Sequence, residues 1–168
     1  HFDDMDANVK NYYYTYQLCN ADWSPANLPG FDYIRGFQTN RITNYRNSSV
    51  AFTRYTHYQA NFPERSMIPT RSGNYLLKVF LNSDTSALCF TKRFLVVDNK
   101  VSIAAQIRQP FSSQYFLTDQ RIQLTVSTAQ ARINIMSPQD LKVAVLQNNI
   151  WPTSALLTRP SVFRGNYF

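Results

Sequence analysis

Hydrophobic and polar residues alternate with a period of two along most of the chain. The clearest run covers 12–19, where Tyr14, Tyr16 and Leu18 fall on one face. Similar runs cover 50–59, 75–81 and 88–97, and in the first of these Val50 and Phe52 face the side opposite His57. A second series covers 101–107, 121–126, 132–136, 141–146 and a short stretch near Val162. Such runs, separated by turn residues, predict antiparallel strands.

The segment 23–47 breaks this pattern. It contains Pro25, Pro29, Gly30 and Gly36, and it mixes aromatic residues with arginines. We expect a long connection that crosses between sheets, with a short strand near 33–37. The turn signal Asp98-Asn99-Lys100 then separates two predicted units, 1–99 and 100–168.

Composition supports an all-β chain. Thr, Val and Ile total 32 and the aromatic residues total 25, together about a third of the 168 residues. These side chains suit a pleated, half-buried surface. Glu64 is the only glutamate, so one of the common helix formers is nearly missing. The apolar runs are short (94–97 is typical), far below the roughly 20 residues of a spanning helix. The opening residues lack a basic stretch followed by an apolar one, so we expect no signal peptide within them.

The most informative local motif is Ser72-Gly73-Asn74-Tyr75. In immunoglobulin-like sandwiches a tyrosine after such a corner bonds back to the preceding connection, and a core residue follows two positions later. We therefore predict that the Tyr75 hydroxyl bonds to backbone within 63–71 and that Leu77 lies in the core. The alternative is a strand that simply starts with an aromatic residue. Trp23 fits a core aromatic. The resulting fold class is an immunoglobulin or fibronectin-III-like β-sandwich, followed by a second β-sandwich unit that we expect to be incomplete.

Candidate catalytic chemistry is sparse. The chain has two histidines, one glutamate, and neither a glycine-rich phosphate loop nor His/Cys ligand spacing. Asp4, Asp6 and Asn8 begin like a calcium loop, but the later positions lack its glycine and glutamate, which favours a solvated acidic turn. For His57 we expect a structural, hydrogen-bonded role. The sequence predicts no enzyme, no metal, no cofactor and no small-molecule substrate.

Cysteine usage and charge add little. Cys19 and Cys89 are 70 positions apart, and we expect two free, mostly buried thiols. The net charge of +7 is spread without a run of three basic residues, so we expect no nucleic-acid partner.

Five segments in order resemble a known family: Phe2-Asp3-Asp4-Met5-Asp6, Tyr12-Tyr13-Tyr14 leading to Cys19-Asn20-Ala21-Asp22-Trp23, Tyr55-Thr56-His57-Tyr58, Ser72-Gly73-Asn74-Tyr75 and Thr91-Lys92-Arg93-Phe94. They are similar to the N-terminal region of the type IX secretion system plug protein family of Bacteroidota. The resemblance covers about 1–99, and 100–168 looks like the start of that family's second domain. It implies a non-enzymatic periplasmic protein at the inner face of the outer membrane. Its partner would be the large translocon barrel, whose periplasmic mouth it closes, and it would be peripheral to the membrane at most.

Two other functions fit the composition, a carbohydrate-binding module and an adhesin-type subunit. For partner binding we single out aromatic and arginine residues of the segment 23–47: Phe31, Tyr33, Arg35, Phe37, Arg41 and Arg46. Aromatic residues and arginine are enriched at interfaces, and long connections often carry function. The alternative is that the three aromatic residues plug the end of the sandwich and leave the arginines solvated.

Overall fold

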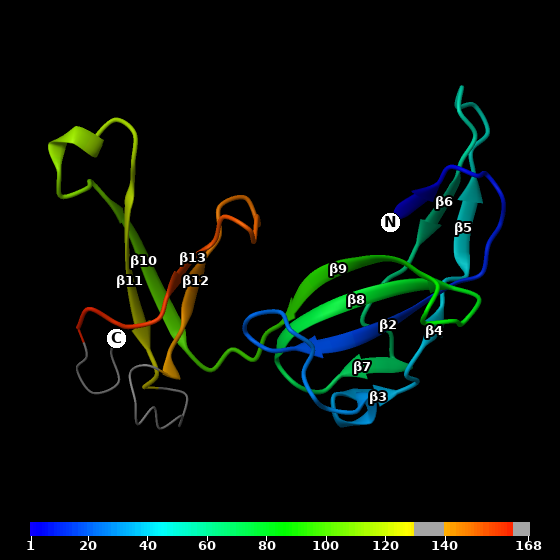
Figure 1. Cartoon of the computed structure of the whole chain (residues 1–168), viewed down its shortest axis with the longest axis horizontal. Coiled ribbons are helices and arrows are strands. Elements are labelled where there is room, and N and C mark those ends of the chain that lie inside the picture. Colours follow the sequence, from blue (N-terminus) through cyan, green and yellow to red (C-terminus); the bar gives the residue numbers. More distant parts are fainter. Residues whose placement is uncertain (130–139, 163–168) are drawn as a thin grey trace. The chain divides into compact units, whose positions relative to one another are not determined.

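The computed structural model describes residues 1–129 and 140–162. Within them the regular elements are strands and two 3-10 turns, η1 (Gly30–Asp32) and η2 (Ser113–Tyr115). The predicted all-β class with antiparallel sheets is confirmed. The chain divides into two compact units, His1–Asp98 and Asn99–Phe168 (Figure 1). No helix among the described residues is long and apolar enough to cross a membrane.

The first unit is built on a four-stranded antiparallel sheet. Its order is β4 (Asn40–Arg41), β2 (Tyr12–Cys19), β8 (Gly73–Leu81) and β9 (Leu88–Val96). The strands predicted at 12–19, 75–81 and 88–97 are β2, β8 and β9. In β2 and β8 the alternate residues are buried as their periodicity indicates, so the longest strands follow the sequence closely.

Two smaller antiparallel sheets complete this unit. One has the order β1 (Phe2–Asp4), β6 (Thr56–Gln59) and β5 (Asn44–Asn47). The other pairs β3 (Ile34–Gly36) with β7 (Met67–Pro69). The predicted strand at 50–59 is therefore wrong over 50–55, because only Thr56–Gln59 finds neighbouring strands.

Tyrosine dominates the core between these sheets. Tyr14, Tyr16, Tyr58 and Tyr75 are all at most 2% exposed. The Phe2 ring stacks on Tyr58 with centroids 5.2 Å apart and meets the edge of Phe90 at 5.0 Å. These contacts join strands of the three-stranded sheet to β9 of the four-stranded sheet, which is the packing expected of sandwich layers.

The predicted tyrosine corner is confirmed. The Tyr75 hydroxyl donates a hydrogen bond of 2.9 Å to the carbonyl oxygen of Arg71. Leu77, two residues further along β8, is buried as expected. The sequence motif therefore marks both the start of β8 and its attachment to the preceding connection.

Two expectations for single residues need correction. Trp23 is half-buried rather than a core residue, because it lies in a turn with a left-handed φ of 68°, and the Arg93 guanidinium carbon sits 4.7 Å from its ring centroid. Both cysteines are free, and Cys19 is buried, but Cys89 is exposed near the start of the edge strand β9.

The second unit contains two strand pairs. β10 (Ser102–Arg108) pairs with β11 (Arg121–Ser127), close to the predicted 101–107 and 121–126. β12 (Val143–Val145), within the predicted 141–146, pairs with β13 (Ala155–Leu157), which the sequence did not indicate. The predicted strand at 132–136 lies outside the described residues. At Val162 the chain is irregular, so the strand predicted there is not found in the described part.

Candidate partner-binding surface

The segment 23–47 is a series of short elements, not one continuous connection. It contributes η1, β3, β4 and β5 to the first unit. The short strand expected near 33–37 is β3. The others have only two to four residues, and all four residues of β5 are exposed, so they produce no hydrophobic period. The six candidate contacts are thus distributed over three sheets and one turn.

Tyr33 lies in the core. It is 4% exposed, and its ring meets that of Tyr75 at a centroid distance of 6.0 Å in an edge-on arrangement. Burial raises the pKa of its hydroxyl above the ordinary value. For this one aromatic residue the alternative interpretation, a plug at the end of the sandwich, describes the structure better.

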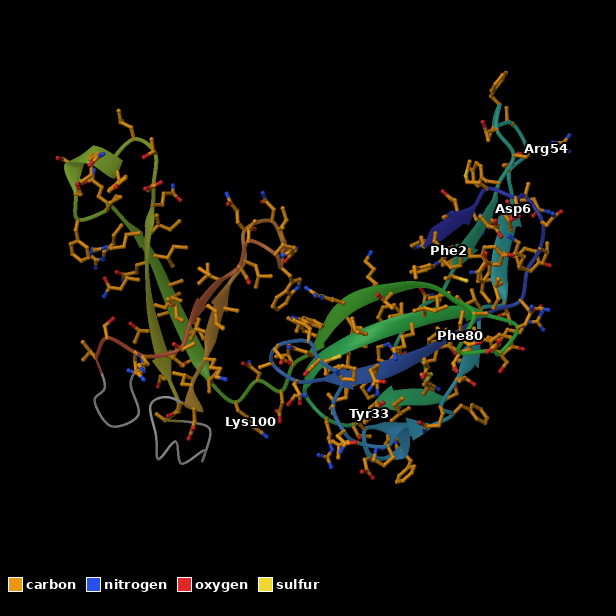
Figure 2. The ribbon with its side chains drawn as sticks, viewed as in Figure 1. Phe2, Asp6, Tyr33, Arg54, Phe80 and Lys100 are labelled. Atoms are coloured by element: carbon orange, nitrogen blue, oxygen red, sulfur yellow. The ribbon has the colours of Figure 1, made fainter. Side chains whose placement is uncertain are left out.

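Phe31 and Phe37 are instead displayed on the surface, 75% and 68% exposed. The backbone around them is well fixed: η1 closes through the Tyr33 N–H donating to the Gly30 carbonyl at 3.2 Å. The Phe37 N–H donates to the Ser66 carbonyl at 2.8 Å. A rigid backbone therefore holds both rings in solvent (Figure 2 labels the neighbouring Tyr33).

Gly36 makes the approach to Ser66 possible. Its φ is +100°, and a Cβ at this position would lie 2.1 Å from the Ser66 carbonyl oxygen. Only glycine avoids both the strained dihedral and the clash with backbone. The display of Arg35 and Phe37 on either side depends on this residue.

The remaining three candidates are exposed arginines. Arg35 lies in β3 opposite Ile68, and Arg41 lies in β4 opposite Tyr13, where its guanidinium donates to the Asn11 side-chain oxygen. Arg46 lies in β5 opposite His57 on the three-stranded sheet. Phe31 lies in η1, Arg35 lies in β3 and Phe37 directly follows β3, whereas Arg41 and Arg46 belong to two other sheets.

The expected solvated acidic turn is wrong for Asp4, whose side chain is 6% exposed. Its carboxylate accepts hydrogen bonds from the Tyr12 hydroxyl at 2.8 Å and the Asp6 N–H at 3.0 Å, and the Lys10 ammonium lies 2.9 Å away. Desolvation pushes the pKa of Asp4 up, but these donors outweigh it and hold the pKa below its ordinary value. A protein cation already neutralises this carboxylate, and no group of three or more metal-ligating side chains occurs in the described part of the chain.

His57 has an acidic partner that its sequence neighbours did not reveal. Its Nδ1 lies 2.6 Å from an Asp3 carboxylate oxygen, and its Nε2 lies 3.2 Å from Nδ1 of His1. β1 brings these residues together, since Asp3 is directly opposite His57 in the sheet register. The structural, hydrogen-bonded role expected for His57 is what this arrangement supports.

Sequence reasoning missed one exposed apolar feature. Val50 and Phe52, assigned to a strand, lie in the loop between β5 and β6 and are 93% and 107% exposed. The signal available was the polar setting, with Asn47, Ser48 and Ser49 before them and Thr53 and Arg54 after them. Of these, Asn47, Ser48 and Ser49 favour a turn over the middle of a strand.

The second unit contains a groove of about 560 Å³ beside β11, β12 and β13. Its lining is largely apolar, with Leu124, Val126, Val143 and Leu157, and Arg121 and Arg159 add positive charge. Among the described residues that line the groove, none is Asp, Glu, His or Cys.

The packed antiparallel sheets and the tyrosine corner are those of a β-sandwich protein. Residues 1–98 match the family described as type 9 secretion system plug protein, 1st domain. The chain belongs to this family, which places it in type IX secretion.

Comparison with solved structures gives a full-length match to the chain. It is similar to the crystal structure of a hypothetical protein from Parabacteroides merdae ATCC 43184, with 27% identity and a TM-score of 0.88. The match covers 99% of this chain and 42% of that one, so the chain spans less than half the length of this relative. No curated protein matches.

Proposed function

We propose that this chain is part of a non-enzymatic plug that closes the periplasmic end of the outer-membrane translocon pore in type IX secretion. One observation carries the proposal. The family match covers 1–98, which coincides with the compact unit His1–Asp98. The match to the plug family therefore extends over a whole compact unit and is not limited to a few short motifs.

The surface of this unit supports a function through protein contacts. Phe31 and Phe37 are exposed on a fixed backbone, and Arg35, Arg41 and Arg46 are exposed on short strands of three different sheets. Aromatic residues and arginine are the types enriched where proteins bind each other. We propose these five residues as contacts to the translocon barrel, with Tyr33 holding η1 and β3 onto the core behind them.

The experiment is affinity purification of the full-length protein from its host's envelope. Recovery of a large outer-membrane barrel supports the plug, whereas recovery of polysaccharide or of no partner contradicts it. Polysaccharide would favour the carbohydrate-binding alternative instead.

A charge reversal tests the surface. The variant Arg35→Glu/Arg41→Glu/Arg46→Glu should fold normally and bind the barrel at least about 10-fold more weakly, roughly the loss of one hot spot. The matched control is Lys92→Glu/Arg108→Glu/Lys142→Glu, which changes the net charge equally at exposed positions elsewhere. Equal binding by both variants and the parent protein would show that this surface is not the docking face.

A further inference from the structure

The loop between β5 and β6 exposes apolar side chains more fully than any strand of the first unit. Val50 is 93% and Phe52 is 107% exposed at the tip of this hairpin. The hairpin extends away from the four-stranded sheet in Figure 1, and Figure 2 labels Arg54 near its end. We call residues 48–55 the hairpin tip.

The hairpin tip stands on an ordered base. The Ser48 N–H donates to the Tyr55 carbonyl at 2.9 Å, and the Tyr55 N–H donates to the Ser48 hydroxyl at 3.0 Å. Below them β5 and β6 pair from Asn47↔Thr56 to Asn44↔Gln59. Tyr58, which is completely buried, anchors β6 in the core. Because the base is ordered before binding, the hairpin tip loses less conformational entropy when it binds a partner.

The hairpin itself carries charge of one sign. Between Asp32 and Glu64 the chain carries four arginines and no acidic residue. Three aspartates lie near the hairpin base, where Asp3 bonds to His57 and one cation, Lys10, pairs with both Asp4 and Asp6. The charges that the hairpin itself brings to a partner are those of Arg46 and Arg54, and their complement is acidic.

We propose that the hairpin tip inserts into an apolar socket rimmed by carboxylates on the translocon barrel protein. This inference rests on the proposed plug function and adds to it a second point of attachment, which shares Arg46 with the first. Val50 and Phe52 would fill the socket, and Arg46 and Arg54 would pair with its rim. A protein socket fits better than a lipid surface, because two large apolar side chains are few for membrane anchoring, which uses a wide apolar face or several signals.

The test of the apolar contacts compares three full-length proteins: the parent, Val50→Ser/Phe52→Ser, and the control Leu117→Ser. Leu117 is 100% exposed in the second unit, so its replacement removes an equally accessible apolar side chain elsewhere. Binding is measured to the barrel protein recovered by the affinity purification, held in detergent, and to vesicles of phosphatidylethanolamine and phosphatidylglycerol. Thermal unfolding checks that all three fold alike.

We expect the double variant to bind the barrel at least about 10-fold more weakly than the parent, with the control unchanged and no protein binding the vesicles. Binding by Arg46→Glu/Arg54→Glu should also depend less on salt than binding by the parent between about 0.1 M and about 1 M, where the Debye length falls from about 10 Å to about 3 Å.

Two results overturn the inference and leave the plug function standing. One is a double variant that binds the barrel as tightly as the parent. The other is parent protein that binds vesicles through Val50 and Phe52 while its barrel binding is independent of them, which assigns the tip to lipid. If the parent protein recovers no barrel at all, the plug function itself fails.

Discussion

Tyr75→Phe tests the tyrosine corner by removing a single oxygen atom. The ring is completely buried and keeps its neighbours in the variant, since Phe94 stacks on it at 5.3 Å and Tyr33 meets its edge at 6.0 Å. What is lost is the 2.9 Å hydrogen bond to the Arg71 carbonyl. The variant therefore isolates the link between β8 and the connection before it.

The expected cost is about 1 kcal/mol, the net value of an ordinary hydrogen bond in a folded protein. A larger cost arises where the abandoned partner stays buried, but Arg71 is an exposed residue, so solvent can reach that part of the chain. For a unit of this size, about 1 kcal/mol lowers the midpoint of thermal unfolding by roughly 4–8 °C.

The assay is thermal unfolding followed by circular dichroism, with Tyr45→Phe as the matched control. Tyr45 is 43% exposed on β5, and its replacement also removes one phenolic oxygen while leaving the ring against Tyr58. We expect the control to unfold at the parent's temperature. If Tyr75→Phe also matches the parent, or if both variants shift equally, the corner does not stabilise the unit in the way argued.

Three further predictions concern the first unit. Asp4→Asn should lower the free energy of unfolding by about 2 kcal/mol, because it removes the charge that Lys10, Tyr12 and the Asp6 N–H stabilise, while Asp6→Asn, at a 70% exposed carboxylate, should change it much less. Because the pKa of Asp4 is lowered on folding, the parent should keep this contribution above about pH 4 and lose it as the pH falls through the folded pKa. Acid unfolding of the parent and of Asp4→Asn should therefore show their free energies of unfolding converging as the pH falls. Burial raises the pKa of Tyr14 and Tyr75, so stability should be intact below about pH 10 and fall as the pH rises further, and an unchanged urea midpoint across that range would contradict their burial. Gly36→Ala should destabilise the first unit by more than about 1 kcal/mol, because Gly36 has a left-handed φ and a Cβ there would clash with the Ser66 carbonyl. At Gly30 a Cβ meets only the end of the Gln38 side chain, so a larger loss of stability in Gly30→Ala than in Gly36→Ala would contradict this reason.

The sequence predicts those parts of the fold that have a local signal. β2 and β8 are long enough for alternation to be visible, and Tyr75 is preceded by residues that identify a corner. β3, β4 and β5 have two to four residues, too few to show any period. They form because they pair with strands distant in the chain. Val50 and Phe52 show the opposite case, in which an alternating pattern has no strand to pair with.

The exposure of the candidate contacts is predictable to a similar extent, while their role as contacts stays a prediction. Residue type alone identified Phe31, Phe37 and the three arginines as available for contacts, and all five are exposed. Tyr33 has similar neighbours in the sequence, yet it is buried. The direction of a side chain depends on which sheet its backbone joins, and the local sequence does not show this. The pairing of His57 with Asp3 also depends on register between distant strands, which no local motif encodes.

The two central strands of the four-stranded sheet are far apart in the sequence of the first unit, because Tyr12 lies opposite Leu81 and Cys19 lies opposite Asn74. No hairpin can nucleate this pairing, so the closure of a long loop must precede it. Domains dominated by such distant contacts fold in milliseconds to seconds, whereas helical bundles need microseconds to milliseconds. Until β8 arrives, this edge of β2 has no strand to pair with. A chain that emerges N-terminal end first therefore leaves this edge of β2 unpaired from the passage of residue 19 until residue 81 has followed, and an unpaired strand edge invites wrong pairing.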